Sequence, residues 1–312
     1  MRAIDLFAGA GGASLGMHRA GLELVQAVEM DSAACETHRA ALPGCPVWEG
    51  DIRDWSPPAA ELWWAAPPCQ AWSSAGKRLG VDDERNGWPW VWNAIDRAAE
   101  PPLWLIAENV PGMTHHRTNG CGSSSCPGCY LEQTVYSELR SRFAHVEARI
   151  LNAADYGVPQ ARKRLFIVAG PRPYQWPIPT HCDPTAALLL ACGRLPWRTM
   201  GEALELGSEA RAIGGGRNPQ SAAVAHKRNY RDLTDEPSVT MTAEQIGNRG
   251  PWIEDGSRRR LTVGECAILQ GFPESPWKGN LSQQYRQVGN AVPPPMAEAL
   301  VQTLSEELGH NL

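Results

Sequence analysis

The chain opens on a short apolar segment that runs directly into a glycine-rich turn. Residues 3–7 form a candidate buried strand, residues 9–12 the turn, and residues 13–20 a candidate helix. Further apolar runs of strand length follow at 24–28, 62–66, 103–107 and 164–169. Strands that alternate with helices in this way predict an α/β fold built on a mostly parallel sheet.

The composition changes near residue 171. Prolines cluster from there to residue 184, and no clear alternation of strands and helices continues to about residue 257. We therefore predict a separate, irregular lobe at 171–257 and a larger unit formed by 1–170 together with 258–312. Helical patterns resume at 262–269 and from Pro294, where proline suits a first turn.

The net charge of −5 counts against a DNA-binding protein until its distribution along the chain is considered. Residues 111–260 carry 19 basic and 14 acidic side chains, and this excess suits contact with a polyanion. A solvated surface of mixed charge is the alternative. No apolar run reaches the roughly 18 residues that a membrane span needs. The first residues do not form a signal peptide, so we expect a cytoplasmic protein.

The glycine-rich turn has the spacing of a ligand-binding loop. A turn with Gly9, Gly11 and Gly12 lets a ligand approach the backbone, and the following helix offers its N-terminus to an anion. The GxGG spacing fits pyrophosphate poorly, whereas a methionine carboxylate would suit the same amides. Glu29 closes the next strand and could accept hydrogen bonds from ribose hydroxyls, and Asp51 could receive an adenine amino group. Each of these residues also has a purely structural alternative.

Three other motifs follow apolar segments. Two prolines fix the backbone beside Cys69, as a nucleophile requires, although a lone cysteine can also be a buried filler. Glu108 ends a strand, where a carboxyl group can protonate or hold a heterocycle, or form a cap or salt bridge. Arg162 and Arg164 would share one face of a strand and suit phosphate or a base edge; the alternative is a solvated run of charge.

Taken together and in order, these motifs resemble those of the cytosine-C5 DNA methyltransferases. The matching segments are Asp5–Gly12, Pro67–Gln70, Gly76–Arg78, Asp82–Asn86, Glu108–Val110, Gln160–Arg164, Arg260–Pro273 and Gly289–Val292. The resemblance covers nearly the whole chain except about 111–130 and 171–257. It implies the Rossmann-like fold of methyltransferases that use S-adenosylmethionine. It also implies that 171–257 is a smaller target-recognition lobe.

The resemblance also implies catalytic roles. Cys69 would attack carbon 6 of a flipped cytosine, and Glu108 would engage ring nitrogen 3 and the exocyclic amine. Arg164 would support the base oxygen, Arg162 would lie on phosphate or on the Cys69 loop, and Asn109 would orient the segment that carries the cysteine. Carbon 5 would then take the methyl group from the sulfonium.

The cofactor and DNA contacts follow from the same resemblance. Phe7 would stack on the adenine, and Asn290 and Val292 would close the methionine end. The expected cofactor contacts are Asp5, Phe7, Gly9, Gly11, Gly12, Glu29, Met30, Asp51, Ile52, Pro68, Asn290 and Val292. The expected contacts with double-stranded DNA are Gln70, Ser73, Lys77, Arg78, Arg217, Lys227, Arg228 and Arg231.

The expected setting is a nucleoid-associated monomer with a cognate restriction endonuclease. Two alternatives are the same chemistry on tRNA and a catalytically inactive DNA-binding relative. The second alternative is disfavoured because Cys69, Glu108 and both arginines are present. A nucleotide-binding oxidoreductase would leave the proline–cysteine and arginine motifs unexplained.

A cysteine cluster departs from the family pattern. It consists of Cys121, Cys126 and Cys129, with His115 and His116 just upstream. In a cytosolic chain such a cluster suggests metal or reactive thiols rather than disulfides. Three thiolates and one imidazole are structural-zinc ligands, so 111–130 is a candidate zinc-binding insertion. The spacing leaves open which histidine would bind, and the alternative is a loop whose thiols hold no metal.

Overall fold

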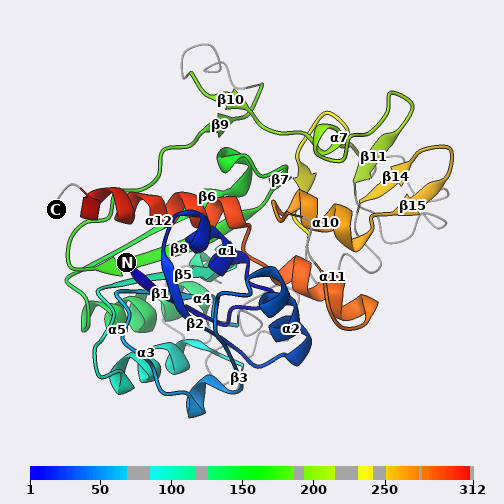
Figure 1. Cartoon of the computed structure of the whole chain (residues 1–312). Coiled ribbons are helices and arrows are strands. Elements are labelled where there is room, and N and C mark those ends of the chain that lie inside the picture. The colour runs from blue at the N-terminus through cyan, green and yellow to red at the C-terminus, as the bar shows by residue number, and fades with distance from the viewer. Residues whose placement is uncertain are drawn as a thin grey trace.

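A seven-stranded sheet forms the centre of the molecule (Figure 1). The computed structural model describes residues 1–68, 85–116, 126–185, 193–214, 231–241, 251–273 and 276–309. The sheet runs in the order β3 (Val47–Glu49), β2 (Glu23–Glu29), β1 (Arg2–Leu6), β4 (Leu62–Ala65), β5 (Trp104–Asn109), β8 (Lys163–Gly170) and β6 (His145–Asn152). β8 pairs antiparallel with both of its neighbours, β5 and β6, and the other strand pairs of this sheet are parallel. The predicted α/β fold with a mostly parallel sheet is confirmed.

Helices cover both faces of the sheet. One face packs against α1 (Gly12–Arg19) and α12 (Pro294–Gly309). The other packs against α3 (Trp88–Arg97), α4 (Pro127–Tyr130), the π-helical turn η4 (Leu131–Val135) and α5 (Tyr136–Arg140). Successive strand residues serve opposite faces, so Trp63 and Trp64 are both fully buried in different cores. This explains why the strands read as continuous apolar runs.

Close backbone packing joins the start of the chain to its C-terminal part. A Cβ atom added at Gly12 would lie 2.1 Å from the carbonyl oxygen of Val292, and one at Gly16 would lie 2.5 Å from that of Pro294. Gly11 has a φ of 87°, which glycine adopts without strain. Gly12 is therefore needed for packing, whatever else the turn binds.

The elements expected from apolar periodicity are present. The five expected strands correspond to β1, β2, β4, β5 and β8. The helix expected at 262–269 is α10 (Val263–Leu269), whose N-terminus carries a capping box formed by Thr262 and Glu265. The remaining elements of the larger unit are α2 (Ser32–Ala41), η1 (Ile52–Asp54), η3 (Pro111–Thr114), η5 (Ala153–Tyr156), β7 (Gln160–Ala161) and α11 (Leu281–Asn290).

The smaller lobe contains more regular structure than its sequence suggested. Its four-stranded antiparallel sheet runs in the order β12 (Arg231–Asp232), β11 (Arg211–Gly214), β14 (Trp252–Glu254) and β15 (Arg258–Arg260). The other short elements are β9 (His181–Cys182), β10 (Leu195–Pro196), α7 (Met200–Ala203) and β13 (Ser238–Val239). The boundary expected at residue 257 falls in the turn between β14 and β15.

The two parts of the molecule are joined by packing and by a strand pair. Ala212 and Ile253 of the lobe share a buried cluster with Cys266 of α10 and Val288 of α11. β13 also pairs in parallel with β7, next to the large sheet. Among the described residues, no helix is both long and apolar enough to cross a membrane.

Candidate active site

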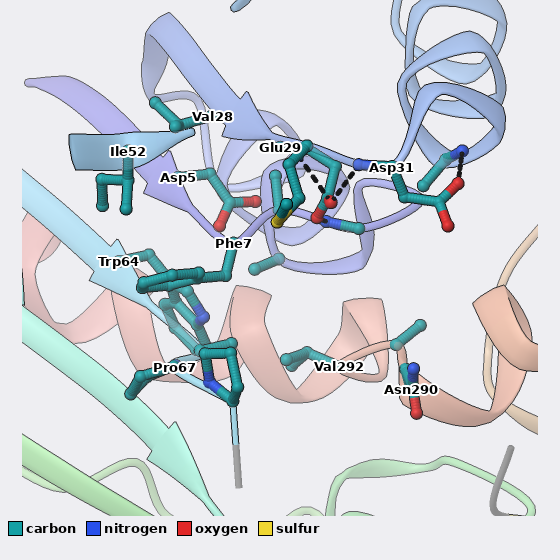
Figure 2. A pocket seen from close by; sticks show the side chains of 18 of the residues that line it. Asp5, Phe7, Val28, Glu29, Asp31, Ile52, Trp64, Pro67, Asn290 and Val292 are labelled. Carbon is teal, nitrogen blue, oxygen red and sulfur yellow. Dashed lines mark hydrogen bonds between the residues drawn. The ribbon is translucent and has the colours of Figure 1, made fainter. Parts of the chain in front are cut away.

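A cavity of about 310 Å³ opens at the carboxyl ends of β1, β2 and β4 (Figure 2). Ten of the twelve residues expected to contact the cofactor line it: Asp5, Phe7, Gly9, Glu29, Met30, Asp51, Ile52, Pro68, Asn290 and Val292. Gly11 and Gly12 are not in its lining, in keeping with the packing role of Gly12. Ligands of open α/β sheets bind at this kind of strand edge.

Glu29 is fixed at the end of β2 by backbone amides. Its carboxylate accepts hydrogen bonds from the N–H groups of Gly9, Met30 and Asp31, each at 2.8 Å. Figure 2 shows this carboxylate at the upper rim of the cavity, with Asn290 and Val292 on the opposite wall. A carboxylate has about four acceptor sites, so capacity remains for a ligand hydroxyl.

Asp5 lies at the floor of the same region and is 1% exposed. Its carboxylate accepts hydrogen bonds from the backbone N–H of Ser14 at 3.0 Å and from its hydroxyl at 2.6 Å. Burial nevertheless raises the pKa of Asp5 to about 7. A cationic ligand group nearby would favour the charged carboxylate.

Asp51 is already engaged by a neighbouring cation. Its carboxylate accepts hydrogen bonds from the backbone N–H of Arg53 at 2.9 Å and from the side-chain Nε at 3.0 Å. The hydrogen bond from Arg53 lowers the pKa of Asp51. The Arg53 guanidinium in turn lies 5.3 Å from the ring centre of Trp90. An adenine amino group at Asp51 would share this carboxylate with Arg53.

Sequence reasoning missed two tryptophans of the cavity. Trp64 and Trp90 both line it, and the Trp90 ring centre lies 6.3 Å from that of Phe7. Trp64 was treated only as part of an apolar strand, and no motif points to Trp90. The pair formed by Phe7 and Trp90 provides aromatic surface at the cavity wall.

A charged pair stands where β5 ends. Arg164 Nε lies 2.8 Å from Glu108 Oε1, and each side chain is only 12% exposed. Glu108 also lines the cavity. Asn109 donates a hydrogen bond to the carbonyl oxygen of Pro67 at 3.3 Å, which ties β5 to the segment that leads to Cys69. Cys69 itself lies outside the described residues.

Arg162 does not share the position of Arg164. It lies between β7 and β8 and donates hydrogen bonds to the carbonyl oxygens of Met241 and Gly289, at 2.9 and 3.1 Å. The side chain is 2% exposed, so the expected contact with a DNA phosphate does not fit this structure. The guanidinium instead connects β8 with the smaller lobe and the end of α11. Its other expected position, on the Cys69 loop, lies outside the described residues.

Gln160 is a second connection that the sequence did not reveal. Its side chain bonds to the backbone N–H of Met241 and to the side chain of Gln270, at 3.1 and 2.8 Å. Both glutamines are fully buried. Gln160 and Arg162 therefore hold Met241 from two sides, and the motif that contains them joins the lobe to the sheet.

Most of the expected DNA contacts cannot be placed. Seven of the eight expected contacts lie outside the described residues: Gln70, Ser73, Lys77, Arg78, Arg217, Lys227 and Arg228. Cys121 of the cysteine cluster also lies outside them. Arg231 lies in β12, opposite Gly214 of β11. Of the two candidate histidines, His116 is the one that groups with Cys126 and Cys129.

Known proteins with similar sequences are cytosine methyltransferases. The family model described as C-5 cytosine-specific DNA methylase matches residues 1–186 and 202–306. Type II methyltransferase M.AplI of Arthrospira platensis is 32% identical over 325 residues, which cover 98% of this chain and 86% of the relative. Type II methyltransferase M.NgoMIV of Neisseria gonorrhoeae is 32% identical over 332 residues, which cover 95% of each protein.

Solved structures of methyltransferases share the fold. The S. pombe Dnmt2 methyltransferase aligns with a TM-score of 0.70 at 18% identity, over 99% of each chain. A putative DNA modification methyltransferase encoded within an E. coli prophage aligns with a TM-score of 0.63 at 20% identity, also over 99% of each chain. The family model spans most of the sequence, and the two solved structures share the α/β fold over nearly the whole chain. The chain therefore belongs to the C-5 cytosine-specific DNA methylase family, whose members methylate cytosine in DNA.

Proposed function

We propose that the protein transfers a methyl group from S-adenosylmethionine to carbon 5 of a cytosine flipped out of duplex DNA, through a covalent adduct with Cys69. One observation supports this most directly. The cavity lined by Phe7 and Glu29 is also lined by Glu108 and by Pro67 and Pro68, which immediately precede Cys69. A methyl donor and a cytosine would therefore meet at one edge of the sheet.

The chemistry of the cavity fits S-adenosylmethionine. Its volume lies within the roughly 300–1,000 Å³ common for small-molecule sites. Phe7 and Trp90 offer aromatic surface to an adenine, and the Glu29 carboxylate is placed to accept ribose hydroxyls. Asp5, whose pKa is raised to about 7 by burial, would gain charge beside a cation. Bound S-adenosylmethionine would supply an electrophilic methyl group on a positively charged sulfur.

Cys69 and Glu108 would activate the cytosine for methyl transfer. The Cys69 thiolate would add to carbon 6 of the base, while Glu108 gives a proton to ring nitrogen 3, so that carbon 5 becomes the nucleophilic end of an enamine. Carbon 5 would then take the methyl group that S-adenosylmethionine, held by Glu29 and by the aromatic pair of Phe7 and Trp90, would supply. Loss of the carbon-5 proton to water, departure of the Cys69 thiolate and return of the nitrogen-3 proton to Glu108 restore the aromatic ring.

Arg164 and Asn109 would position these groups. Arg164 already donates from Nε to Glu108, and the other donors of a guanidinium leave it able to reach the base oxygen. The hydrogen bond from Asn109 to Pro67 would hold the backbone that presents Cys69. Arg162 would act through the lobe contacts that it makes rather than on the base.

DNA recognition is assigned to the smaller lobe. It carries the basic candidates Arg217, Lys227, Arg228 and Arg231, and its packing on α10 and α11 places it beside the cavity wall formed by Asn290 and Val292. Because the named relatives are Type II methyltransferases, we propose a cognate restriction endonuclease as the functional partner. The protein would work as a monomer on the cytoplasmic nucleoid, where that DNA lies.

The test is methyl transfer from radiolabelled S-adenosylmethionine to three substrates. These are cytosine-containing duplex DNA, the same duplex with every cytosine replaced by 5-methylcytosine, and tRNA. We expect label only in the first, recovered as 5-methylcytosine after digestion. Preferential labelling of tRNA would support the alternative substrate, and labelling of the methylated duplex would contradict carbon 5 as the acceptor.

The cofactor assignment predicts a loss of affinity in Glu29→Ala. Removal of a charge-assisted hydrogen bond costs about 1.5–3 kcal/mol, so the dissociation constant for S-adenosylmethionine should rise on the order of tenfold to a hundredfold. Calorimetric titration measures this constant directly. Glu29 also binds three backbone amides, so Glu29→Gln, which keeps an acceptor oxygen, should lose less.

Glu49→Gln is the matched control for this experiment. Glu49 ends the neighbouring strand β3 but pairs with Arg39 and does not line the cavity. Its replacement should leave the dissociation constant unchanged. An unchanged constant in Glu29→Ala would remove Glu29 from the cofactor site.

A further inference from the structure

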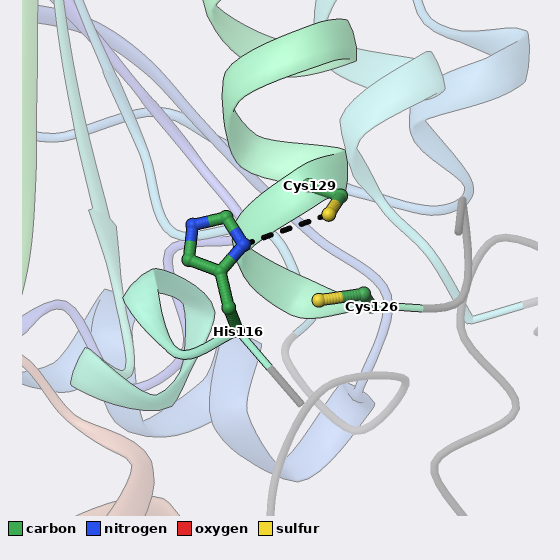
Figure 3. Close-up of side chains that lie close together, drawn as sticks. All are labelled: His116, Cys126 and Cys129. Atoms are coloured by element: carbon green, nitrogen blue, oxygen red, sulfur yellow. Dashed lines mark hydrogen bonds between the residues drawn. The ribbon is translucent and has the colours of Figure 1, made fainter. Parts of the chain in front are cut away.

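Three metal-ligand side chains, none of them assigned to methyl transfer, meet between η3 and α4 (Figure 3). His116, Cys126 and Cys129 place one imidazole nitrogen and two sulfur atoms within 4.8 Å of one another. His116 Nδ1 lies 3.5 Å from Cys129 Sγ. In a tetrahedral zinc site with ordinary Zn–S and Zn–N bonds, these two ligand atoms lie about 3.6 Å apart. The pair formed by His116 and Cys129 therefore already has the spacing of two zinc ligands.

The two partners of the His116 ring are also those expected of a zinc-binding histidine. While Nδ1 faces Cys129, Nε2 lies 3.4 Å from the carboxylate of Glu132. A histidine that binds zinc through one nitrogen ordinarily donates its other N–H to a carboxylate or carbonyl, which fixes the tautomer and the ring orientation. Here one histidine has both partners, one on each side of the ring.

The helix α4 carries a glycine, Gly128, where it packs against the His116 ring. A Cβ atom at Gly128 would lie 2.8 Å from the His116 ring, so only a glycine lets the imidazole approach Cys126 and Cys129. Both cysteines are buried, at 1% and 5% exposure, whereas His116 is exposed. Two thiols buried beside an imidazole form a compact, soft ligand set of the kind that selects zinc.

We propose that His116, Cys126 and Cys129 bind one zinc ion as a structural site. The site is independent of the reaction, which needs no metal. A tetrahedral ion takes a fourth ligand, and we leave that position unassigned because Cys121, the candidate from the sequence, lies outside the described residues. The thiols bind as thiolates, so each coordinated cysteine releases one proton to solvent.

The ion would stabilise a junction beside the catalytic strand. His116 follows Glu108 and Asn109 through η3, and Cys126 starts α4, so the metal joins two segments that the chain connects through residues 117–125. Without metal, the described link between them includes a hydrogen bond from Gly128 N–H to the carbonyl oxygen of His115 at 3.1 Å. Closing a loop with a metal removes freedom from the unfolded chain and stabilises the folded one.

The same helix reaches the segment that carries Cys69. The hydroxyl of Tyr130, at the end of α4, accepts a hydrogen bond from Asn86 Nδ2 at 2.9 Å, and both residues are buried. Asn86 lies where the described chain resumes after residues 69–84. Fixing α4 would thereby fix one end of the nucleophile-bearing segment.

A disulfide between Cys126 and Cys129 is the competing reading of the same spacing, because two cysteines separated by two residues at a helix start are also a redox motif. A disulfide would not explain why the His116 ring lies between Cys129 and Glu132. The two readings differ in metal content and in the mass of the peptide that contains both cysteines.

The experiment measures zinc in protein purified under reducing conditions without added metal or chelator. We expect one equivalent per chain by elemental analysis, and the double variant Cys126→Ser, Cys129→Ser should contain none. The variant Cys35→Ser, Cys266→Ser, which removes two buried cysteines elsewhere, should keep the full equivalent. Because neither DNA nor methyl donor is present, the result is separate from a failure of the proposed function.

A second measurement covers the case in which the double variant does not fold. Zinc is removed from the wild-type protein and returned, and Glu132→Gln is titrated in parallel. Zinc should restore the thermal unfolding midpoint where magnesium does not, and Glu132→Gln should bind zinc about tenfold to a hundredfold more weakly. Metal-free protein that takes up no zinc, or a Cys126–Cys129 disulfide preserved by alkylating free thiols at cell lysis before any reductant is added, would overturn the proposal.

Discussion

Replacing Cys69 with alanine should abolish methyl transfer and leave the affinity for S-adenosylmethionine nearly unchanged. Carbon 5 of cytosine is a poor nucleophile until a thiolate adds to carbon 6, so turnover should fall on the order of 10⁴-fold or more. Apart from Pro68, the cofactor contacts that we assign lie on other segments, chiefly the strand ends of β1 and β2. Single-turnover rates and calorimetric titration measure the two effects separately.

A duplex that carries 5-fluorocytosine at the target base gives the more specific readout. Fluorine at carbon 5 cannot leave as a proton, so wild-type protein should stay covalently attached to the DNA under denaturing conditions, whereas Cys69→Ala should not. Cys266→Ser is the matched control, because burial raises the pKa of Cys266 to about 12 and leaves this thiol unreactive at neutral pH. Trapping by Cys69→Ala, or none by the wild type, would refute the assigned nucleophile.

Glu108→Gln should produce the second large loss. The amide cannot give a proton to ring nitrogen 3, and removing a positioned general acid lowers rates about 10²- to 10⁴-fold. Its oxygen can still accept the hydrogen bond from Arg164, so the thermal unfolding midpoint should change little. Single-turnover kinetics at saturating DNA and cofactor isolate this chemical step.

The matched control for Glu108 is Glu61→Gln. Glu61 is also a carboxylate near a strand of the central sheet, but it is exposed and bonds to the backbone N–H of Arg2. Its replacement should leave the rate unchanged. If Glu108→Gln retained the wild-type rate, Glu108 would be a structural partner of Arg164 and nothing more.

The central sheet was predictable because both of its faces are covered. Burial on both sides makes β1, β4, β5 and β8 continuous apolar runs, which stand out in the sequence. Edge strands carry no such signal. β6 is partly exposed along its length and alternates apolar with charged side chains, and β3 has only three residues, so neither was expected.

The candidate site was predictable wherever a residue sits in an ordered family motif. Phe7, Glu108 and Asn290 were found in this way and lie around one cavity. Trp90 was missed because its place depends on how α3 packs across the sheet, which no local pattern encodes. The buried position of Arg162 was missed for a related reason, since its partners lie 79 and 127 residues away in sequence.

The contact of Gly12 and Gly16 with the segment that leads into α12 has a consequence for biosynthesis. On the ribosome, the glycine turn, Cys69 and Glu108 are all made long before Val292 and Pro294, whose carbonyl oxygens these glycines face. Until then the cluster that buries Met17 completely lacks its members from α12, among them Leu300. Contacts of such long sequence separation form late and slowly. A nascent or truncated chain that lacks α12 should therefore expose this apolar face to chaperones and proteases, and methyltransferase activity should arise only after α12 has been made.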